Sequence, residues 1–208
     1  MSYLDTERSL YEIEIALAKK FEYLKNIIVF NVKGESEDLP IWHECDCIVL
    51  SKSGYLTEIE IKRSWQDFLN DFKKKNRERK SLIKYFYYCV PEKLLDKVYE
   101  RLDEEREKDK NFIYTGIITY DEDLNLKEWN FRYKFGMDEK WSYATPALHN
   151  KKLYLEQRLA LARLGCIKTI KEKKKAIALQ KLNNEVSAEQ EEMIEEIIDV
   201  EIKEGSLF

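Results

Sequence analysis

The stretch from His43 to Phe68, HECDCIVLSKSGYLTEIEIKRSWQDF, predicts two strands, a tight turn between them and the start of a helix. The first strand carries Asp46, and the turn falls around Lys52-Ser53-Gly54. The second strand runs from Tyr55 to Lys62 and ends in Glu-Ile-Glu-Ile-Lys. Ser64 then serves as the N-cap of a helix. The pattern therefore predicts a β-hairpin followed directly by a helix.

The polar residues of this hairpin predict a cluster on one face. Side chains alternate along a strand, so Glu58, Glu60 and Lys62 point to the same side, and Asp46 comes beside the Glu60–Lys62 end. Magnesium prefers carboxylates, water and phosphate oxygens, so Asp46 and Glu60 are candidate ligands, joined by the backbone carbonyl of Ile61. Lys62 could orient an attacking water or stabilise charge on a phosphate. A solvated face with surface ion pairs is the alternative interpretation.

Composition bounds the class of protein. The chain has 208 residues, 44% of them hydrophobic, which is enough for a core, and a formal net charge of -4. A surface for nucleic acid must therefore be a local patch. Cys45, Cys47 and Cys89 lie in apolar runs and are expected to pack as small hydrophobes. No run is long enough for a membrane span, and no signal peptide is evident, so we expect a soluble, cytoplasmic protein.

Strands and helices alternate along the first 123 residues. A first helix reaches about Leu24, Gly34–Pro40 is interpreted as a loop, and the predicted order is α-β-β-β-α-β-α-β. The predicted fold class is α/β, with a central mixed β-sheet flanked by helices. Residues 124–208 are predicted to form an aromatic arm and a helical C-terminal extension, with helix breaks near Gly165 and around Asn183-Asn184.

Further residues could contribute to a site. Glu14 falls within the apolar stripe of the first helix, where a carboxylate is either paired and functional or reaches solvent at the edge. Asp67 and Asp71 share a helix face and could tether a nearby cation or lie on the surface. His43 is interpreted as a residue that caps its strand. A basic run could contact backbone phosphates or be a solvated loop; it comprises Lys73, Lys74, Lys75, Arg77, Arg79 and Lys80.

The segment DCIVLSKSGYLTEIEIKRSWQDFLNDFKK, followed by KYFYYCVPEKLLDKV, resembles the PD-(D/E)xK nuclease superfamily, and within it the MmcB-like group linked to DNA repair. Asp46, Glu60 and Lys62 match the acidic, acidic and basic positions of the motif, although Cys45 stands where a proline is usual. The resemblance implies a restriction-endonuclease-like core, magnesium dependence and phosphodiester hydrolysis. It also implies an acidic residue on the first helix, for which Glu14 is the candidate.

The site residues and the resemblance together predict a Mg²⁺-dependent deoxyribonuclease of the endonuclease type, in which Mn²⁺ could replace Mg²⁺. Asp46, Glu60, Lys62 and Glu14 are its candidate catalytic residues, and Asp46, Glu60 and Ile61 hold the metal. DNA repair or the DNA metabolism of mobile elements and phages are the expected settings, and RNA remains open as a substrate. The alternative is a protein that binds nucleic acid or a partner without cleaving. The acidic final helix could form homo-oligomers or bind another protein.

Overall fold

The computed structural model describes residues 8–36, 39–72, 82–108, 115–129, 133–135, 140–142 and 150–205. The chain forms two compact units, Met1–Gly165 and Cys166–Phe208. The domain boundary predicted at residue 123 falls inside the first unit. No helix in the described ranges has the length and apolar character needed to span a bilayer.

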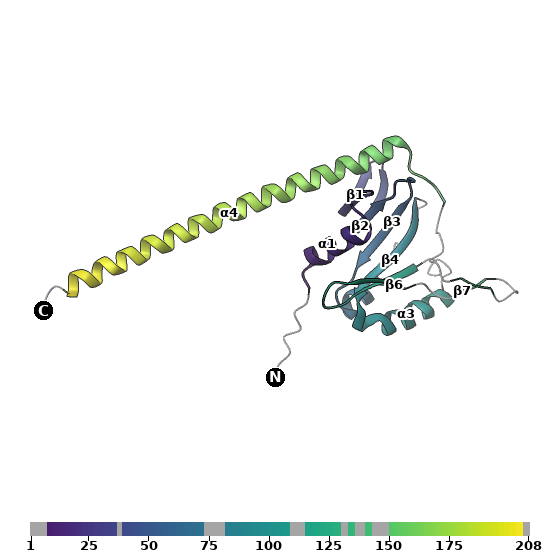
Figure 1. Ribbon diagram of the computed structural model, residues 1–208, viewed down its shortest axis with the longest axis horizontal. Helices are drawn as coiled ribbons and strands as arrows, with labels where there is room; N and C mark the ends of the chain where they lie inside the picture. Colours follow the sequence, from purple (N-terminus) through teal and green to yellow (C-terminus); the bar gives the residue numbers. More distant parts are fainter. Residues whose placement is uncertain are drawn as a thin grey trace. The chain divides into compact units, whose positions relative to one another are not determined.

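A six-stranded mixed sheet forms the centre of the first unit (Figure 1). Its strands lie in sequence order: β1 (Ile27–Ser36), β2 (Leu39–Leu50), β3 (Leu56–Ile61), β4 (Ile83–Pro91), β5 (Thr115–Tyr120) and β6 (Leu126–Trp129). The pairs β3–β4 and β4–β5 are parallel, and the other neighbouring pairs are antiparallel. A separate hairpin joins β7 (Tyr133–Phe135) to β8 (Lys140–Ser142).

The helices are α1 (Leu10–Lys20), α2 (Trp65–Asp71), α3 (Leu95–Lys108) and α4 (Leu155–Gly205), with a 3₁₀ turn at Glu92–Leu94. Helix α1 buries Ile13 and Leu17 in a core on one face of the sheet. Helices α2 and α3 contribute side chains such as Phe68 and Leu102 to a second core on the other face. The predicted fold class, a mixed α/β sheet flanked by helices with a C-terminal helix, is confirmed.

The first helix is shorter than predicted. Ser9 and Glu12 form a capping box at its start, and the helix ends at Lys20. Glu22 then adopts a positive φ of 51°, which turns the chain away from the helical path. Leu24, predicted as the last residue of this helix, is consequently 85% exposed. The predicted extent to Leu24 is therefore wrong.

The predicted loop at Gly34–Pro40 is also wrong. Strand β1 extends to Ser36 and β2 begins at Leu39, so most of this polar stretch is paired as a hairpin. A register shift between Val32 and Gly34 bends the ladder. Leu39 and Ile41 are buried in the same core as Phe68, and this burial holds the distal part of the hairpin against the unit. The stretch predicted as a loop therefore contains one buried anchor, Leu39, and Ile41 is a second anchor just beyond it.

Helix α4 runs without the predicted breaks at Gly165 and Asn183-Asn184. A single glycine inside a helix costs only about 1 kcal/mol relative to alanine, which a long helix tolerates. Gly165 also has a packing reason, because a Cβ atom there would lie 3.2 Å from Cγ2 of Val29 on β1. Glycine allows the helix to pass this close to the strand.

The predicted turn at Gly54 is confirmed, and its glycine is required. Gly54 has φ of 93°, its N–H donates to Ser51 O, and its carbonyl accepts from Leu153 N. A Cβ atom at this position would collide with the guanidinium of Arg158, whose Nε donates to Leu153 O. The turn thus supports the segment that leads into α4.

We expect Gly54→Ala to lower the free energy of unfolding by about 1–2 kcal/mol, because alanine resists a left-handed backbone. Urea denaturation of both proteins measures the change. Lys52→Ala in the same turn is the matched control and should shift stability by no more than about 0.5 kcal/mol, since the backbone N–H of Lys52, bonded to Asn26 Oδ1, is retained. Equal stability of Gly54→Ala and wild type would contradict the assignment.

Candidate functional site

Asp46, Glu60 and Lys62 meet at the carboxyl end of β3. Lys62 Nζ lies 2.8 Å from Glu60 Oε2 and 3.8 Å from Asp46 Oδ2. Glu60 and Lys62 are only 7% and 5% exposed, whereas the Asp46 side chain is about one-third exposed. The cluster is therefore a buried group with one carboxylate open to solvent, and not the solvated face of the alternative interpretation.

The backbone positions Asp46 through a break in strand pairing. The recorded register between β2 and β3 ends at the pair Cys47–Ile59. Beyond it, Asp46 Oδ2 accepts a hydrogen bond of 2.8 Å from the N–H of Ile61. The side chain of Ile61 points to the core beneath α1, so the predicted ligand residue presents its backbone at the site. The Asp46 carboxylate thus accepts the hydrogen bond that a backbone carbonyl of a paired strand would otherwise accept from Ile61.

A third carboxylate contacts Lys62 from α2. Asp71 Oδ1 lies 3.6 Å from Lys62 Nζ, and Tyr88 on β4 donates a hydrogen bond of 2.7 Å to Asp71 Oδ2. Asp71 is buried, whereas Asp67 is exposed and its N–H donates to the Ser64 cap. The tether interpretation therefore holds for Asp71, and the surface interpretation holds for Asp67.

The electrostatics of the cluster are dominated by burial. Desolvation, followed by the repulsion of Asp46, raises the pKa of Glu60 to about 7. Burial opposes the charge of Lys62, but the carboxylates of Glu60 and Asp71 outweigh it and raise its pKa to about 12. Within the described chain, Glu60 Oε1 is buried without a hydrogen-bond donor. Because such an oxygen is costly to bury, Glu60 is poised to accept a cation or a proton.

Glu14 lies inside the stripe of α1 and is 8% exposed, so the solvent-reaching interpretation is wrong. Asn31 Nδ2 donates a hydrogen bond of 3.2 Å to Glu14 Oε1. Burial is the largest cause that raises the pKa of the Cys47 thiol, and the charges of Cys89, Glu14 and Asp46 raise it further. The carboxylate oxygens of Glu14, Asp46 and Glu60 do not all lie within 4.8 Å of one another. Its catalytic role stays a prediction.

The predicted basic run lies outside the described residues. The same holds for the side chains of an apolar strip that the sequence pattern predicts along the acidic final helix. These are Lys73, Lys74, Lys75, Arg77, Arg79 and Lys80 in the run, and Met193, Ile194, Ile197, Ile198 and Ile202 in the strip.

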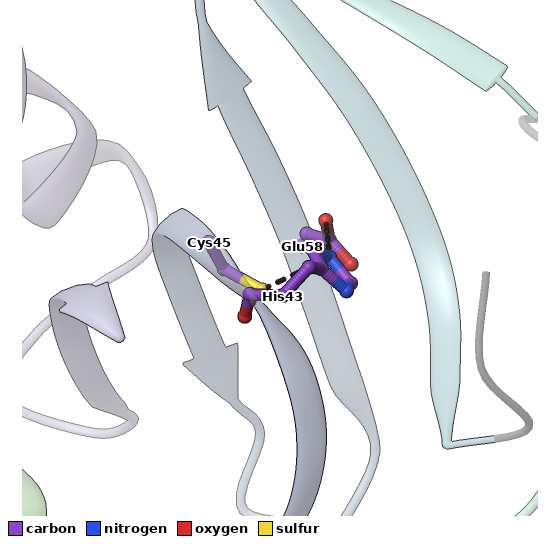
Figure 2. A group of neighbouring side chains, drawn as sticks. All are labelled: His43, Cys45 and Glu58. Carbon is purple, nitrogen blue, oxygen red and sulfur yellow. Dashed lines mark hydrogen bonds and ion pairs between the residues drawn. The ribbon is translucent and has the colours of Figure 1, made fainter. Parts of the chain in front are cut away.

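Sequence reasoning missed a second cluster, formed by His43, Cys45 and Glu58 (Figure 2). His43 Nε2 lies 2.7 Å from Glu58 Oε1 and 3.3 Å from Cys45 Sγ. The His-x-Cys spacing on one strand was an available signal, because residues two apart share a face. The third member, Glu58, could not be predicted, because the regular register of the hairpin pairs Glu58 with Ile48 and not with His43.

We expect Tyr88→Phe to destabilise the protein by about 1.5–3 kcal/mol, because it removes a buried donor from the Asp71 carboxylate. The free energy of unfolding measured by urea titration checks this value. Tyr85→Phe on the same strand is the comparison; its ring is half-buried in the other core, and removal of its hydroxyl should have a smaller effect. A loss for Tyr88→Phe no larger than for Tyr85→Phe would refute the role of this bond.

Comparison with known proteins does not identify a family for this chain. No family model and no curated protein matches the chain. Among solved structures, a protein of unknown function from Silicibacter pomeroyi is similar over 82% of this chain and 90% of that chain, with 14% identity and a TM-score of 0.47. This likeness carries no argument about activity, so a functional assignment must rest on the chemistry of the site.

Proposed function

We propose that this protein is a metal-dependent nuclease that hydrolyses phosphodiester bonds in DNA. The observation that carries the proposal is the Glu60 carboxylate: it is buried beside Asp46 and Lys62, and its Oε1 has no hydrogen-bond donor among the described residues. A purely structural ion pair gains nothing from an unsatisfied buried oxygen. In a site that binds a cation, such an oxygen is available as a ligand.

The donor set fits Mg²⁺ or Mn²⁺. Asp46 and Glu60 offer carboxylate oxygens, Asp46 stays partly open to solvent, and the Ile61 backbone lies next to both. Hard divalent cations of this kind use one or two carboxylates and complete their shell with water and phosphate oxygens. When bound, the metal would polarise the phosphodiester and lower the pKa of a coordinated water. Asp46, Glu60 and the Ile61 carbonyl are the residues that would hold it.

Lys62 supplies a fixed positive charge in this site. Its raised pKa keeps the ammonium protonated at neutral pH, and three carboxylates hold it in place. A protonated lysine cannot act as the base, so its role is to stabilise negative charge that develops on the phosphate or to orient the attacking water. Asp71 and Tyr88 are positioning residues, because they act through Lys62.

DNA is the proposed substrate because the Asp-strand, Glu-x-Lys-strand and following helix resemble the nuclease motif. The test is a cleavage assay of the full chain on single-stranded and double-stranded DNA and RNA, with Mg²⁺, Mn²⁺ or a chelator. We expect cleavage of DNA that requires the metal and stops with the chelator. Cleavage of RNA alone would shift the substrate class. DNA binding without cleavage under all conditions would favour the non-catalytic alternative.

A partner-binding role has a separate observation in its favour. Ile167, Ile170 and Ile177 on α4 are 41%, 54% and 55% exposed, and their spacing places them along one side of a helix. An apolar stripe of this kind suits self-association or a helical partner. We expect the full chain to self-associate in light scattering, and Ile170→Glu with Ile177→Glu to reduce the mass. Lys175→Glu, at an exposed position away from the stripe, should leave the mass unchanged. A monomeric wild type would rule out self-association.

A further inference from the structure

We propose that His43, Cys45 and Glu58 form a second metal site, which binds a borderline-soft divalent cation such as Zn²⁺. The three side chains offer a ring nitrogen, a sulfur and a carboxylate oxygen, all within 4.8 Å of one another. Figure 2 shows His43 and Cys45 on the curved part of β2, facing Glu58 on β3. The site is distinct from Asp46, Glu60 and Lys62 and does not depend on the proposed nuclease activity.

The chain creates this group by curving β2. Strands β2 and β3 pair from Leu50 opposite Leu56 to Cys47 opposite Ile59. If this register continued, His43 would lie past the end of β3. Instead, the distal hairpin bends at the irregularity between Val32 and Gly34. Regular pairing would place His43 opposite Arg63, five residues from Glu58, whereas His43 Nε2 lies 2.7 Å from Glu58 Oε1.

The distances are close to those of a zinc shell. Tetrahedral Zn²⁺ with Zn–N and Zn–O of about 2.0–2.2 Å and Zn–S of about 2.3 Å separates its ligand atoms by roughly 3.3–3.6 Å. Cys45 Sγ and His43 Nε2 are 3.3 Å apart, and His43 Nε2 and Glu58 Oε1 are 2.7 Å apart. A cation needs only a small outward movement of the half-exposed His43 ring, whereas the two buried ligands stay in place.

Glu58 provides the independent sign of a missing ligand. Its side chain is 2% exposed, and its second oxygen, Oε2, is buried without a hydrogen-bond donor in the described chain. The hydrogen bond with His43 involves Oε1 and not Oε2. A cation between the three side chains would neutralise this carboxylate and could take Oε2 as a further ligand. Zinc sites that have three protein ligands keep a position for water, which the partly exposed His43 side leaves open.

The chemistry of Cys45 points to a soft metal and away from Mg²⁺. Cys45 is fully buried, and its Sγ lies 3.3 Å from His43 Nε2, so sulfur and imidazole are offered side by side. When Zn²⁺ binds, the thiol releases its proton to solvent and the thiolate becomes the ligand, while His43 presents an unprotonated Nε2. Sulfur and imidazole select zinc-like ions, whereas Asp46 and Glu60 offer oxygen alone.

The test uses the full chain, freed of metal with a chelator, and Co²⁺ as the probe. We expect one Co²⁺ per chain to bind with a near-ultraviolet thiolate-to-cobalt band and visible bands of tetrahedral intensity, apart from any Co²⁺ held by Asp46 and Glu60. Zn²⁺ should abolish these bands by displacing that ion. Binding at Asp46 and Glu60 would give no thiolate band, so the two sites are distinguished. Absence of the thiolate band at saturating Co²⁺ would overturn the proposal.

Variants assign the ligands. Cys45→Ser should remove the thiolate band, and His43→Ala should weaken Co²⁺ binding by at least about tenfold, the lower range seen when metal sites lose supporting groups. Cys166→Ser, which changes an exposed thiol in the second unit, is the matched control and should bind as wild type does. His43 is half-exposed, so its variant keeps the test valid if Cys45→Ser fails to fold. A band lost in Cys166→Ser and kept in Cys45→Ser would also overturn the proposal.

Discussion

Replacement of Lys62 by methionine is expected to lower Mg²⁺-dependent DNA cleavage by at least about a hundredfold, the usual effect of losing a charge that stabilises a transition state. Methionine keeps most of the length of the side chain and removes only the ammonium. That ammonium contacts Glu60, Asp46 and Asp71. The measurement is the single-turnover rate at saturating Mg²⁺.

Two controls separate chemistry from folding in this experiment. Lys84→Met removes a lysine from the neighbouring strand β4, where Nζ lies 3.7 Å from the centre of the Tyr55 ring, and should leave cleavage unchanged. Loss of Lys62 leaves buried carboxylates without their ammonium, which can cost about 3–5 kcal/mol. The thermal unfolding of each variant is therefore measured together with its cleavage rate. Cleavage by folded Lys62→Met at the wild-type rate would refute the assigned role.

Phe68→Ala should lower the free energy of unfolding by about 3–5 kcal/mol. Phe68 is fully buried, and its ring centre lies 5.5, 5.0 and 5.1 Å from those of Trp65, Phe72 and Tyr88. Helix α2 has only seven residues, too few to be stable alone, so this packing holds it in place. Urea denaturation monitored by tryptophan fluorescence measures the loss.

The effect of Phe68→Ala should extend to the cluster, because Asp71 on α2 holds Lys62 from the same helix. Tyr11→Ala, at an aromatic position of α1 that is 64% exposed, is the comparison and should change stability by no more than about 0.5 kcal/mol. A loss below about 1 kcal/mol for Phe68→Ala would mean that the aromatic cluster does not anchor α2.

Local patterns in the sequence predicted much of the fold. The apolar runs identified the five strands β1 to β5, and Ser64 and Gly54 identified a helix start and a turn. Long-range packing decided what local patterns could not. Leu39, in a polar stretch, is buried by residues distant in the chain, and Gly165 remains helical because it faces Val29. At Leu39 and Gly165, packing therefore overrides the loop and the helix break that the local sequence predicted.

The candidate site shows the same division. Alternation along β3 correctly placed Glu60 and Lys62 on one face, and Asp46 does contact Lys62. Nothing in the local pattern predicted that Asp46 would accept the Ile61 N–H, or that Tyr88 would donate to Asp71. The curvature that brings His43 to Glu58 depends on the whole hairpin and its core. Strand periodicity predicts faces, whereas bends and tertiary contacts decide which faces meet.

The central claim is that Asp46 and Glu60 bind a divalent cation next to Lys62. A crystal structure of the full chain with Mn²⁺, recorded with anomalous scattering, tests it most directly. We predict an anomalous peak coordinated by oxygens of Asp46 and Glu60, and loss of that peak in Glu60→Gln. A well-ordered site without Mn²⁺ at saturating concentration, in which Lys62 bridges the carboxylates unchanged, would contradict the account.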